Sequence, residues 1–284
     1  MNAIRIFLKD IRIEHTLFAL PFAYVGAVMG ARGLPSLWQF VWITLAVLGA
    51  RTAAMAANRY FDRKMDAANP RTARRALATG ALPASVMVWA IVGGIALLLV
   101  SAAMLNPLCL ALLPIAALGI LVYPLCKRFT WLVHFVLGAV DAFAPLGAFI
   151  AVTGTVTLPA MLLFFAVTLW VAGFDILYAL MDYGFDVENG VKSVPVAFGE
   201  RNGRFVALAL HVVMVMLLLG AGVLAQATPV YYLGVLLAAL LVVYERRLIA
   251  IASNLFVLNE RIFVTNMAFS VVFLGTTVLS FLAR

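Results

Sequence analysis

Long apolar stretches without charges alternate with short charged segments along the whole chain. Residues 76–126 form 51 consecutive positions without a charge, which fits two membrane-spanning helices of about 20 residues better than one. The dipeptide Asn106-Pro107 is a turn signal within this stretch. Residues 131–174, with a single charge, and residues 205–244, with none, are of similar length. The pattern predicts nine membrane-spanning helices, at 16–32, 37–57, 84–105, 107–126, 131–151, 159–181, 205–225, 229–246 and 262–283.

The composition of the chain excludes a soluble protein. Hydrophobic residues make up 65% of the 284 residues and charged residues 11%, against roughly 45–50% and 25% in globular domains. The mean hydropathy is +1.10. A soluble enzyme, a disordered regulator and a secreted disulfide scaffold are therefore excluded, and the sequence lacks the alternating pattern of a membrane β-barrel. We expect one polytopic, all-α membrane domain over residues 1–284, in which Cys109 and Cys126 are packing residues.

The distribution of Lys and Arg predicts the orientation of the chain in the membrane. Of the 20 Lys and Arg residues, 17 fall in the N-terminal arm or in the loops after the second, fourth, sixth and eighth predicted helices. By the positive-inside rule these segments face the cytoplasm. We therefore expect a multi-pass protein of a bacterial-type inner (plasma) membrane, with its N-terminus inside and its C-terminus outside. Topology thus explains the net charge of +8, and no nucleic-acid partner is expected.

Two acidic clusters continue the cytoplasmic ends of the second and sixth predicted helices. In the first cluster, Asn58, Asp62 and Asp66 are spaced four residues apart, so on a helix they share one face. In the second cluster, steps of three, four and four place another set on one face, namely Asp175, Tyr178, Asp182 and Asp186. Carboxylates at this spacing repel each other, and the repulsion costs more near hydrocarbon. Two such clusters at the same membrane depth therefore indicate a bound counter-ion.

The donor atoms of the two clusters indicate a hard cation together with a phosphate. Mg²⁺ typically binds one or two carboxylates and shares its remaining positions with water and substrate phosphates. Basic residues that suit phosphate binding follow on the same side of the membrane: Arg71, Arg74, Arg75, Lys127, Arg128 and Lys192. A simpler interpretation is that both segments are solvated loops whose mixed charges set the topology and form surface ion pairs. The repetition of the helical acid spacing favours the binding site.

These segments resemble the two aspartate motifs of the UbiA superfamily of intramembrane aromatic prenyltransferases. The first reads Asn58-x-x-x-Asp62-x-x-x-Asp66 and the second Asp175-x-x-Tyr178-x-x-x-Asp182-x-x-x-Asp186. The segment Tyr123-Pro124-x-x-Lys127-Arg128 and the nine-span layout are also similar, so the resemblance covers essentially the whole chain. Residues 11–21 resemble the 4-hydroxybenzoate polyprenyltransferase branch, some members of which serve menaquinone synthesis. One position departs from the pattern, because Arg59 follows Asn58 where many members have Asp.

The resemblance implies a nine-helix bundle with an active-site cap that faces the cytoplasm. It implies Mg²⁺-dependent transfer of a polyprenyl group from polyprenyl diphosphate to an aromatic acid, 4-hydroxybenzoate or a related one, in ubiquinone or menaquinone biosynthesis. The implied catalytic residues, which are also the implied metal ligands, are Asn58, Asp62, Asp66, Asp182 and Asp186. The implied substrate-binding residues are Arg71, Lys127, Arg128, Lys192, Tyr123, Tyr178, Asp175 and Arg51. Among them, the basic residues would neutralise the leaving diphosphate, and the tyrosines would stabilise an allylic cation.

Arg51 lies seven residues before the first cluster, on the same helical face and two turns deeper in the membrane. It is interpreted either as an anchor for the carboxylate of the aromatic acceptor or as the partner of Asp141 in a buried ion pair. His134 and His211 are expected to be ordinary residues of the bundle.

Two other functions are weighed against prenyl transfer. A transporter of a phosphorylated lipid or ion would predict helices broken near the middle of the membrane, whereas the polar groups here cluster at one face. Another Mg²⁺-dependent membrane lipid transferase, one that moves a phosphatidyl group, would carry an Asp-rich signature with internal and downstream glycines. The sequence lacks that signature.

Overall fold

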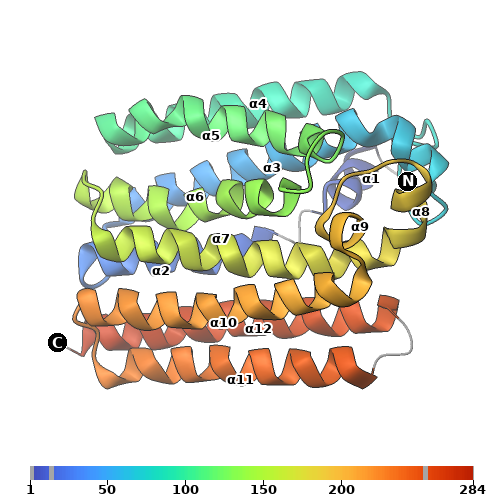
Figure 1. The fold of residues 1–284 in the computed structure, drawn as a ribbon. Coiled ribbons are helices and arrows are strands. Elements are labelled where there is room, and N and C mark those ends of the chain that lie inside the picture. The colour runs from blue at the N-terminus through green and yellow to red at the C-terminus, as the bar shows by residue number, and fades with distance from the viewer. Residues whose placement is uncertain (1–2, 13–15, 252–254, 284) are drawn as a thin grey trace.

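The computed structural model describes residues 3–12, 16–251 and 255–283 (Figure 1). Within these ranges the chain forms helices joined by turns and loops, and it contains no strand. A short 3-10 helix, η2 (Leu180–Asp182), lies between α7 and α8. The α-helices are α1 (Ala3–Asp10), α2 (Thr16–Ala31), α3 (Leu37–Ala68), α4 (Ala84–Leu105), α5 (Pro107–Cys126), α6 (Val133–Thr153), α7 (Leu158–Ala179), α8 (Tyr183–Glu188), α9 (Val194–Phe198), α10 (Glu200–Leu224), α11 (Pro229–Ile251) and α12 (Leu255–Leu282).

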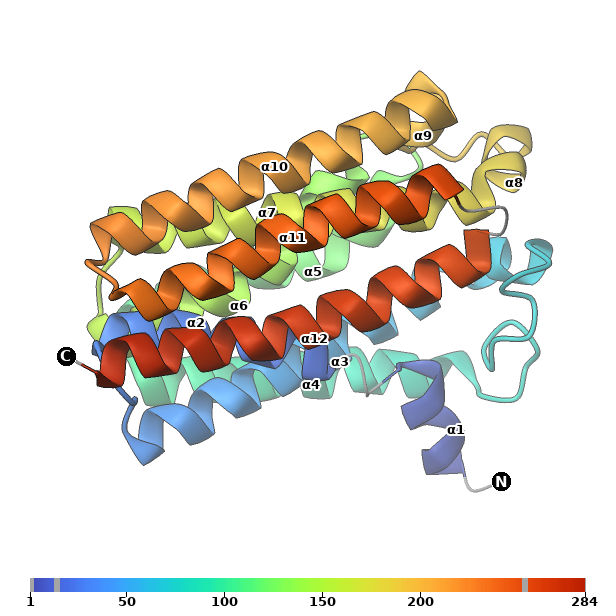
Figure 2. The same cartoon turned by 90° about the horizontal axis from the view of Figure 1, so that it is seen from below.

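The long helices lie roughly side by side in one bundle, and the short elements gather at one end of it (Figures 1 and 2). Helices α1, α8 and α9 lie at this end together with the loop between α3 and α4, whereas the last turn of α12 lies at the opposite end. We call the first of these ends the motif end, because both acidic clusters lie there.

Seven helices of the described chain are long and apolar enough to cross a membrane. They are α3, α4, α5, α6, α7 with its continuation to Glu188, α10, and α12 from Glu260 onward. Two of the nine predicted spans fall outside this set, because the apolar part of α2 is the shorter helix Ala19–Ala31 and the other span corresponds to α11. The expectation of an all-α, multi-pass membrane protein is confirmed, and the count of nine spans stays a prediction.

The larger differences between predicted and observed helices lie at the motif end. The predicted helix 37–57 continues as α3 to Ala68, so the whole first cluster lies on one helix, as expected. The predicted helix 159–181 behaves differently, because α7 ends at Ala179, Asp182 lies in η2 and Asp186 lies in α8. The expectation that one continuous α-helix carries the second cluster was wrong, although all four of its predicted residues line one cavity, described below. A 3-10 turn winds more tightly than an α-helix and therefore changes the direction of the side chains that follow it.

Local sequence explains where several helices begin and end. At the start of α3, Ser36 Oγ accepts from the Gln39 main-chain N–H at 3.2 Å, and Gln39 Oε1 accepts from the Ser36 N–H at 3.0 Å. At the start of α5, Asn106 Oδ1 accepts from the Cys109 N–H at 3.0 Å, and a proline occupies the first helical position. Gly154 ends α6 with a φ of 67°, which a residue without a side chain adopts at little cost. The predicted turn at Asn106-Pro107 is confirmed, as is the break between the predicted helices 131–151 and 159–181.

Glycines allow α6 to pack closely against both α2 and α7. A Cβ atom at Gly26 of α2 would lie 2.0 Å from the Pro145 carbonyl oxygen of α6. A Cβ atom at Gly138 of α6 would lie 2.2 Å from the Thr168 carbonyl oxygen of α7. Both contacts are to main-chain atoms, so rotation of a side chain could not relieve them. The small residues therefore set the spacing of the helices that form one wall of the site described below.

A polar network is buried where α7, α10, α11 and α12 meet. His211 Nδ1 lies 2.6 Å from Glu245 Oε2, and His211 Nε2 lies 3.1 Å from the Trp170 carbonyl oxygen. Asn266 Nδ2 donates to Glu245 Oε1 at 2.8 Å, and Asn266 Oδ1 accepts from the Trp170 indole N–H at 2.5 Å. All four residues are almost completely buried. His211, expected to be an ordinary bundle residue, thus belongs to a network that links four helices.

Candidate active site

A cavity of about 310 Å³ opens between the helices at the motif end, and we call it the polar cavity. Its walls come from α3 and the loop after it, α5, α6, α7, η2, α8 and residues 191–193, with Arg12 after α1 and Phe263 of α12. Most of the predicted site residues line it: Arg51, Asn58, Asp62, Asp66, Arg71, Tyr123, Lys127, Asp175, Tyr178, Asp182, Asp186 and Lys192. The two acidic clusters, far apart in sequence, therefore face one common space.

Arg128, like Arg74, is a predicted basic residue that is absent from the described lining of the polar cavity. Its side chain is exposed, and Nη2 donates to the Phe61 carbonyl oxygen of α3 at 2.7 Å. Although Arg128 follows Lys127 directly, the two side chains diverge. The structure does not bring Arg128 together with the other predicted phosphate-binding residues.

Asp62 is almost completely enclosed, with 1% of its side chain exposed. Its Oδ2 accepts a hydrogen bond from Asn58 Nδ2 at 3.1 Å and forms an ion pair with Lys127 Nζ. Its Oδ1 is buried and has no hydrogen-bond partner within the described chain. A buried oxygen without a donor is costly, so this atom is suited to bind a cation or a donor group of a ligand.

Asp66 and Asp182 are each paired with an arginine of the loop after α3. Arg75 Nη1 lies 2.8 Å from both oxygens of Asp66. Arg71 Nε donates to Asp182 Oδ1 at 2.7 Å, its Nη2 donates to Oδ2, and Asn69 Nδ2 also donates to Oδ1 at 2.9 Å. Burial disfavours the charged guanidinium, but the hydrogen bonds and the charge of Asp182 outweigh burial and raise the pKa of Arg71. Arg71 thus joins the loop after the first cluster to the second cluster.

Asp186 and Lys192 complete the charged lining on the side of α8. Asp186 is buried, and its carbonyl oxygen accepts from the Val191 N–H at 2.9 Å, which closes the turn after α8. This turn brings Lys192 to the rim of the polar cavity, where its side chain is exposed. The Lys192 main-chain N–H donates to the Lys127 carbonyl oxygen at 2.6 Å, which ties the turn to the end of α5.

The acids of the polar cavity suit a cation that is shared with a ligand, and they do not form a closed metal cage. In the part of the chain that the structure describes, no three His, Cys, Asp or Glu side chains converge closely enough to hold a metal on their own. Mg²⁺ requires only one or two protein carboxylates when phosphate oxygens and water complete its coordination. The unpartnered Oδ1 of Asp62, and the acids across the same cavity, fit this kind of site.

A histidine–aspartate pair in the polar cavity went unrecognised in the sequence. His134 Nδ1 lies 2.7 Å from Asp175 Oδ2, and His134 Nε2 accepts from the Val194 main-chain N–H at 3.2 Å. Because Nε2 accepts a hydrogen bond, the ring proton is on Nδ1, and Nδ1 donates to Asp175. His134, expected to be an ordinary bundle residue, therefore orients a carboxylate of the cavity. His134 lies in the first turn of α6 and Asp175 near the end of α7, 41 positions apart in the chain, so no sequence spacing could indicate the pair.

Both interpretations of Arg51 are compatible with its geometry. Arg51 Nη1 lies 3.5 Å from Asp141 Oδ1, so the ion pair considered as an alternative is present. The distance is long for a charged hydrogen bond, which is normally about 2.7–2.9 Å. Arg51 Nε is buried without a hydrogen-bond partner among the described residues. The guanidinium therefore retains donors for a further anionic group.

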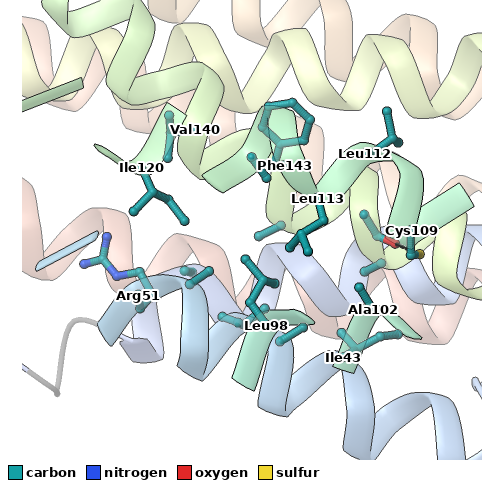
Figure 3. A pocket seen from close by; sticks show the side chains of 18 of the residues that line it. Ile43, Arg51, Leu98, Ala102, Cys109, Leu112, Leu113, Ile120, Val140 and Phe143 are labelled. Atoms are coloured by element: carbon teal, nitrogen blue, oxygen red, sulfur yellow. Dashed lines mark hydrogen bonds between the residues drawn. The ribbon is translucent and has the colours of Figure 1, made fainter. Parts of the chain in front are cut away.

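A second cavity, of about 130 Å³, begins at Arg51 and Asp141 and extends away from the motif end. We call it the apolar cavity. Figure 3 shows Arg51 at one end of its lining, with Leu112 and Cys109 toward the other. Apart from the two charged residues at its entrance, apolar side chains of α2–α6 dominate its walls. Because the same two residues line the polar cavity, the two spaces adjoin each other.

The two predicted aromatic residues differ in their surroundings. Tyr123 is buried, and its hydroxyl donates to the Ala54 carbonyl oxygen of α3 at 3.4 Å. Tyr178 is half-buried, and the Arg71 guanidinium carbon lies 5.8 Å from the centre of its ring. Both rings line the polar cavity on the side of the clusters.

Together, the fold and the site define an intramembrane enzyme whose charged cavity adjoins an apolar one, a combination suited to a substrate with an anionic head and an apolar tail. Comparison with known proteins identifies the family. Residues 19–255 match the UbiA prenyltransferase family, and the chain belongs to this family. The resemblance inferred from the two aspartate motifs is confirmed.

Individual relatives agree with this assignment. The chain is similar to the 4-hydroxybenzoate octaprenyltransferase of Pseudoalteromonas atlantica, with 37% identity over 238 residues, 83% of this chain and 80% of the relative. It is 35% identical over 219 residues to that of Escherichia fergusonii, over 77% and 75% of the two chains. A UbiA homolog from Aeropyrum pernix K1 aligns with a TM-score of 0.85 at 32% identity, over 94% and 98% of the chains. A UbiA homolog from Archaeoglobus fulgidus bound to GPP and Mg²⁺ shares the fold, with a TM-score of 0.75 at 20% identity. The alignment covers 96% of this chain and 99% of that homolog.

Proposed function

We propose that this protein transfers a polyprenyl group from polyprenyl diphosphate to an aromatic acid, 4-hydroxybenzoate or a related one, in ubiquinone or menaquinone biosynthesis. The observation that carries the proposal is the pair of acidic clusters, interspersed with basic side chains, around a polar cavity that adjoins an apolar one. Relatives named 4-hydroxybenzoate octaprenyltransferase support it. The reaction breaks the bond between C1 of the prenyl group and the diphosphate, joins C1 to a ring carbon of the acceptor and releases a ring proton.

We place the diphosphate head and its Mg²⁺ in the polar cavity. The carboxylates proposed to face the metal are Asp62, Asp66, Asp182 and Asp186. Mg²⁺ supplies positive charge that stabilises the departing diphosphate. The unpartnered Oδ1 of Asp62 supports this placement, as does the UbiA homolog from Archaeoglobus fulgidus that is bound to GPP and Mg²⁺. Arg71, Lys127 and Lys192 would donate to the diphosphate oxygens from the same cavity.

We place the acceptor beside Arg51, at the junction of the two cavities. Arg51 lies eleven residues before Asp62 on α3, about 16 Å along the helix axis, and Ile43 lies about 12 Å deeper. If the diphosphate lies near Asp62 and the tail lies in the apolar cavity, C1 of the donor must lie between them, on the side of Arg51. The free Nε of Arg51 and its long contact with Asp141 support binding of the acceptor carboxylate there.

Three further side chains of the polar cavity take proposed roles in substrate binding. Tyr178 and Tyr123 would present π faces to the developing allylic cation. The rings would stabilise the cation in place of water, which such a site excludes. Asp175 would contact the acceptor, and its orientation by His134 supports this role because a fixed carboxylate can bind a hydroxyl group in one geometry.

We infer that the single domain of residues 1–284 crosses the membrane nine times. The motif end would form a cap on the cytoplasmic side, with the N-terminus inside and the C-terminus outside. The placement of 17 of the 20 Lys and Arg residues supports this orientation. The positions of α1 and of the last turn of α12, at opposite ends of the bundle, support an odd number of crossings (Figure 1).

The test is an assay of the purified protein with Mg²⁺, octaprenyl diphosphate and 4-hydroxybenzoate, followed by mass spectrometry of the product and by diphosphate release. We expect Asp62→Ala and Asp182→Ala to abolish product formation although both variants purify folded. Arg246→Ala, an exposed residue of α11, is the control and should retain wild-type activity. Failure of the wild type to prenylate any of a panel of aromatic acids would overturn the function, and near-normal activity of either Asp variant would overturn the site.

A second measurement separates the two roles of Arg51. Arg51→Ala should raise the KM for the aromatic acid much more than the KM for the prenyl diphosphate. Lys192→Ala should do the opposite. An effect of Arg51→Ala on the prenyl diphosphate alone would leave the ion pair with Asp141 as its role.

A further inference from the structure

Arg59 is a buried arginine inside the first acidic cluster, at the position where the chain departs from the pattern of many family members. It is 4% exposed, although a charged side chain is rarely enclosed without partners. Its Nε donates to the Asp10 main-chain carbonyl oxygen at 3.0 Å, and its Nη1 donates to Asn58 Oδ1 at 2.8 Å. The guanidinium therefore bridges the end of helix α1 and the first residue of the cluster.

The contact with Arg59 determines which way the Asn58 amide points. A guanidinium can only donate, so the Asn58 atom that faces it must be the oxygen. The amide nitrogen of Asn58 then faces Asp62 and donates to its Oδ2 at 3.1 Å. Because Lys127 Nζ binds the same oxygen, both donors hold one side of the Asp62 carboxylate. The other oxygen, Oδ1, is left as a buried acceptor without a partner among the described residues.

The N-terminal helix holds the other end of this chain of contacts in place. Asp10 is buried at the end of α1, and its Oδ1 accepts from the Ala76 main-chain N–H at 2.9 Å. The next residue, Ile11, is also buried and packs in a cluster with Ala56 and Met87. The Asp10 carbonyl oxygen, which accepts from Arg59, is thus fixed by α1, by the loop after α3 and by the core beneath them.

We propose that Arg59 is a positioning residue for the cation site, and that Asn58 acts as a hydrogen-bond donor to Asp62 and not as an oxygen ligand of the metal. A relay from Asp10 through Arg59 and Asn58 orients Asp62 so that Oδ1 alone faces the cation. The N-terminal helix α1 thereby becomes part of the site. This inference rests on the proposed function, because it assigns the cation to Asp62.

The two roles of Asn58 predict opposite results for Asn58→Asp. If Asn58 were a metal ligand, a carboxylate of nearly the same shape would bind a hard cation at least as tightly. In the relay, a carboxylate would still accept from Arg59 but would have no donor for Asp62 Oδ2. It would place two negative charges side by side and disturb the carboxylate that binds the metal. We therefore expect Asn58→Asp to weaken metal binding.

The experiment measures binding of Mn²⁺, as a spectroscopic substitute for Mg²⁺, to the detergent-solubilised full chain with inorganic pyrophosphate, by electron paramagnetic resonance. Arg59→Met and Asn58→Asp should each raise the Kd for Mn²⁺ about tenfold or more, the usual effect of removing a group that orients a metal ligand. Arg59→Lys should recover part of the loss, since one ammonium group cannot make both contacts. Arg63→Met is the matched control, because Arg63 lies one turn further along α3 and donates to the Tyr60 carbonyl oxygen.

Asp62→Ala distinguishes failure of this inference from failure of the proposed function. If Asp62→Ala abolishes Mn²⁺ binding while Asn58→Asp binds as tightly as the wild type, the relay is overturned and the metal site stands. If Asp62→Ala leaves binding unchanged, the metal site itself is overturned. Should Arg59→Met fail to fold, Asn58→Asp and Arg59→Lys still decide the question.

Discussion

The ion pair between Lys127 and Asp62 provides a quantitative test of how the site is held together in the absence of substrate. The Asp62 side chain is 1% exposed and the Lys127 side chain 22%. Lys127→Met removes the charge but keeps an unbranched apolar stem of similar length. Removal of one partner of a buried ion pair costs about 3–5 kcal/mol, because the remaining charge stays buried without compensation. Since Lys127 is partly exposed and Asn58 still donates to Asp62, we expect the lower end, about 3 kcal/mol.

The assay is equilibrium unfolding of the purified protein in mild detergent with EDTA, which removes divalent cations. Lys127→Met should lower the free energy of unfolding by about 3 kcal/mol. The double variant Lys127→Met/Asp62→Asn should regain most of it, because replacing both members of a buried pair is often close to neutral. The double-mutant cycle isolates the interaction between the two side chains. Lys64→Met, an exposed lysine on α3, is the control and should change stability by less than about 0.5 kcal/mol.

Two results would refute this reasoning. The first is equal stability of Lys127→Met and the Lys64→Met control, which would show that Lys127 is not the counter-charge of Asp62. The second is a double variant no more stable than Lys127→Met, which would attribute the loss of stability to packing of the lysine stem.

Three further predictions concern packing and the apolar cavity. Gly138→Ala should destabilise the protein by about 1–3 kcal/mol in the same assay, because its Cβ would lie 2.2 Å from a main-chain oxygen. Gly147→Ala is the control and should be neutral, since nothing described lies within 4 Å of its Cβ. Glu245→Leu should lower stability by about 3 kcal/mol, since it leaves His211 Nδ1 without its partner, yet leave both KM values unchanged. Gly147→Phe should fill part of the apolar cavity and shift kcat/KM toward shorter prenyl diphosphates, while Gly93→Phe, on the exposed face of α4, should not.

The first acidic cluster could be predicted from the sequence because spacing and geometry belong to one continuous helix. Asn58, Asp62 and Asp66 repeat every four residues, and α3 continues without a break to Ala68. The contact between Arg51 and Asp141 was one of two alternatives suggested by two isolated charges within apolar spans, and it is present at 3.5 Å. Such cases succeed because a charge in a hydrophobic segment has few possible partners.

For the second acidic cluster, the sequence predicted the residues but not the backbone conformation that carries them. The spacing of Asp175, Asp182 and Asp186 is helical, yet α7 ends at Ala179 and Asp182 lies in η2. Asp182 in that turn is held by Arg71, 111 positions earlier in the chain, and no local pattern reports such a contact. The pairing of Asp175 with His134 and the divergence of neighbouring basic side chains after α5 were missed for the same reason. Each depends on which helices are neighbours in space.

The pairing of three cluster acids with basic side chains has a consequence for how a charged substrate can enter a membrane protein. Asp62, Asp66 and Asp182 already have cationic partners before any metal arrives. Entry of a cation together with a diphosphate is therefore an exchange of partners, in which arginine and lysine side chains pass from carboxylates to phosphate oxygens as the cation takes their place. Such an exchange leaves the total charge of the cavity almost constant. We therefore expect the cation and the diphosphate to bind cooperatively, and each to bind weakly alone. In the empty protein the charges of the site neutralise one another, which lowers the cost of placing them beside the lipid.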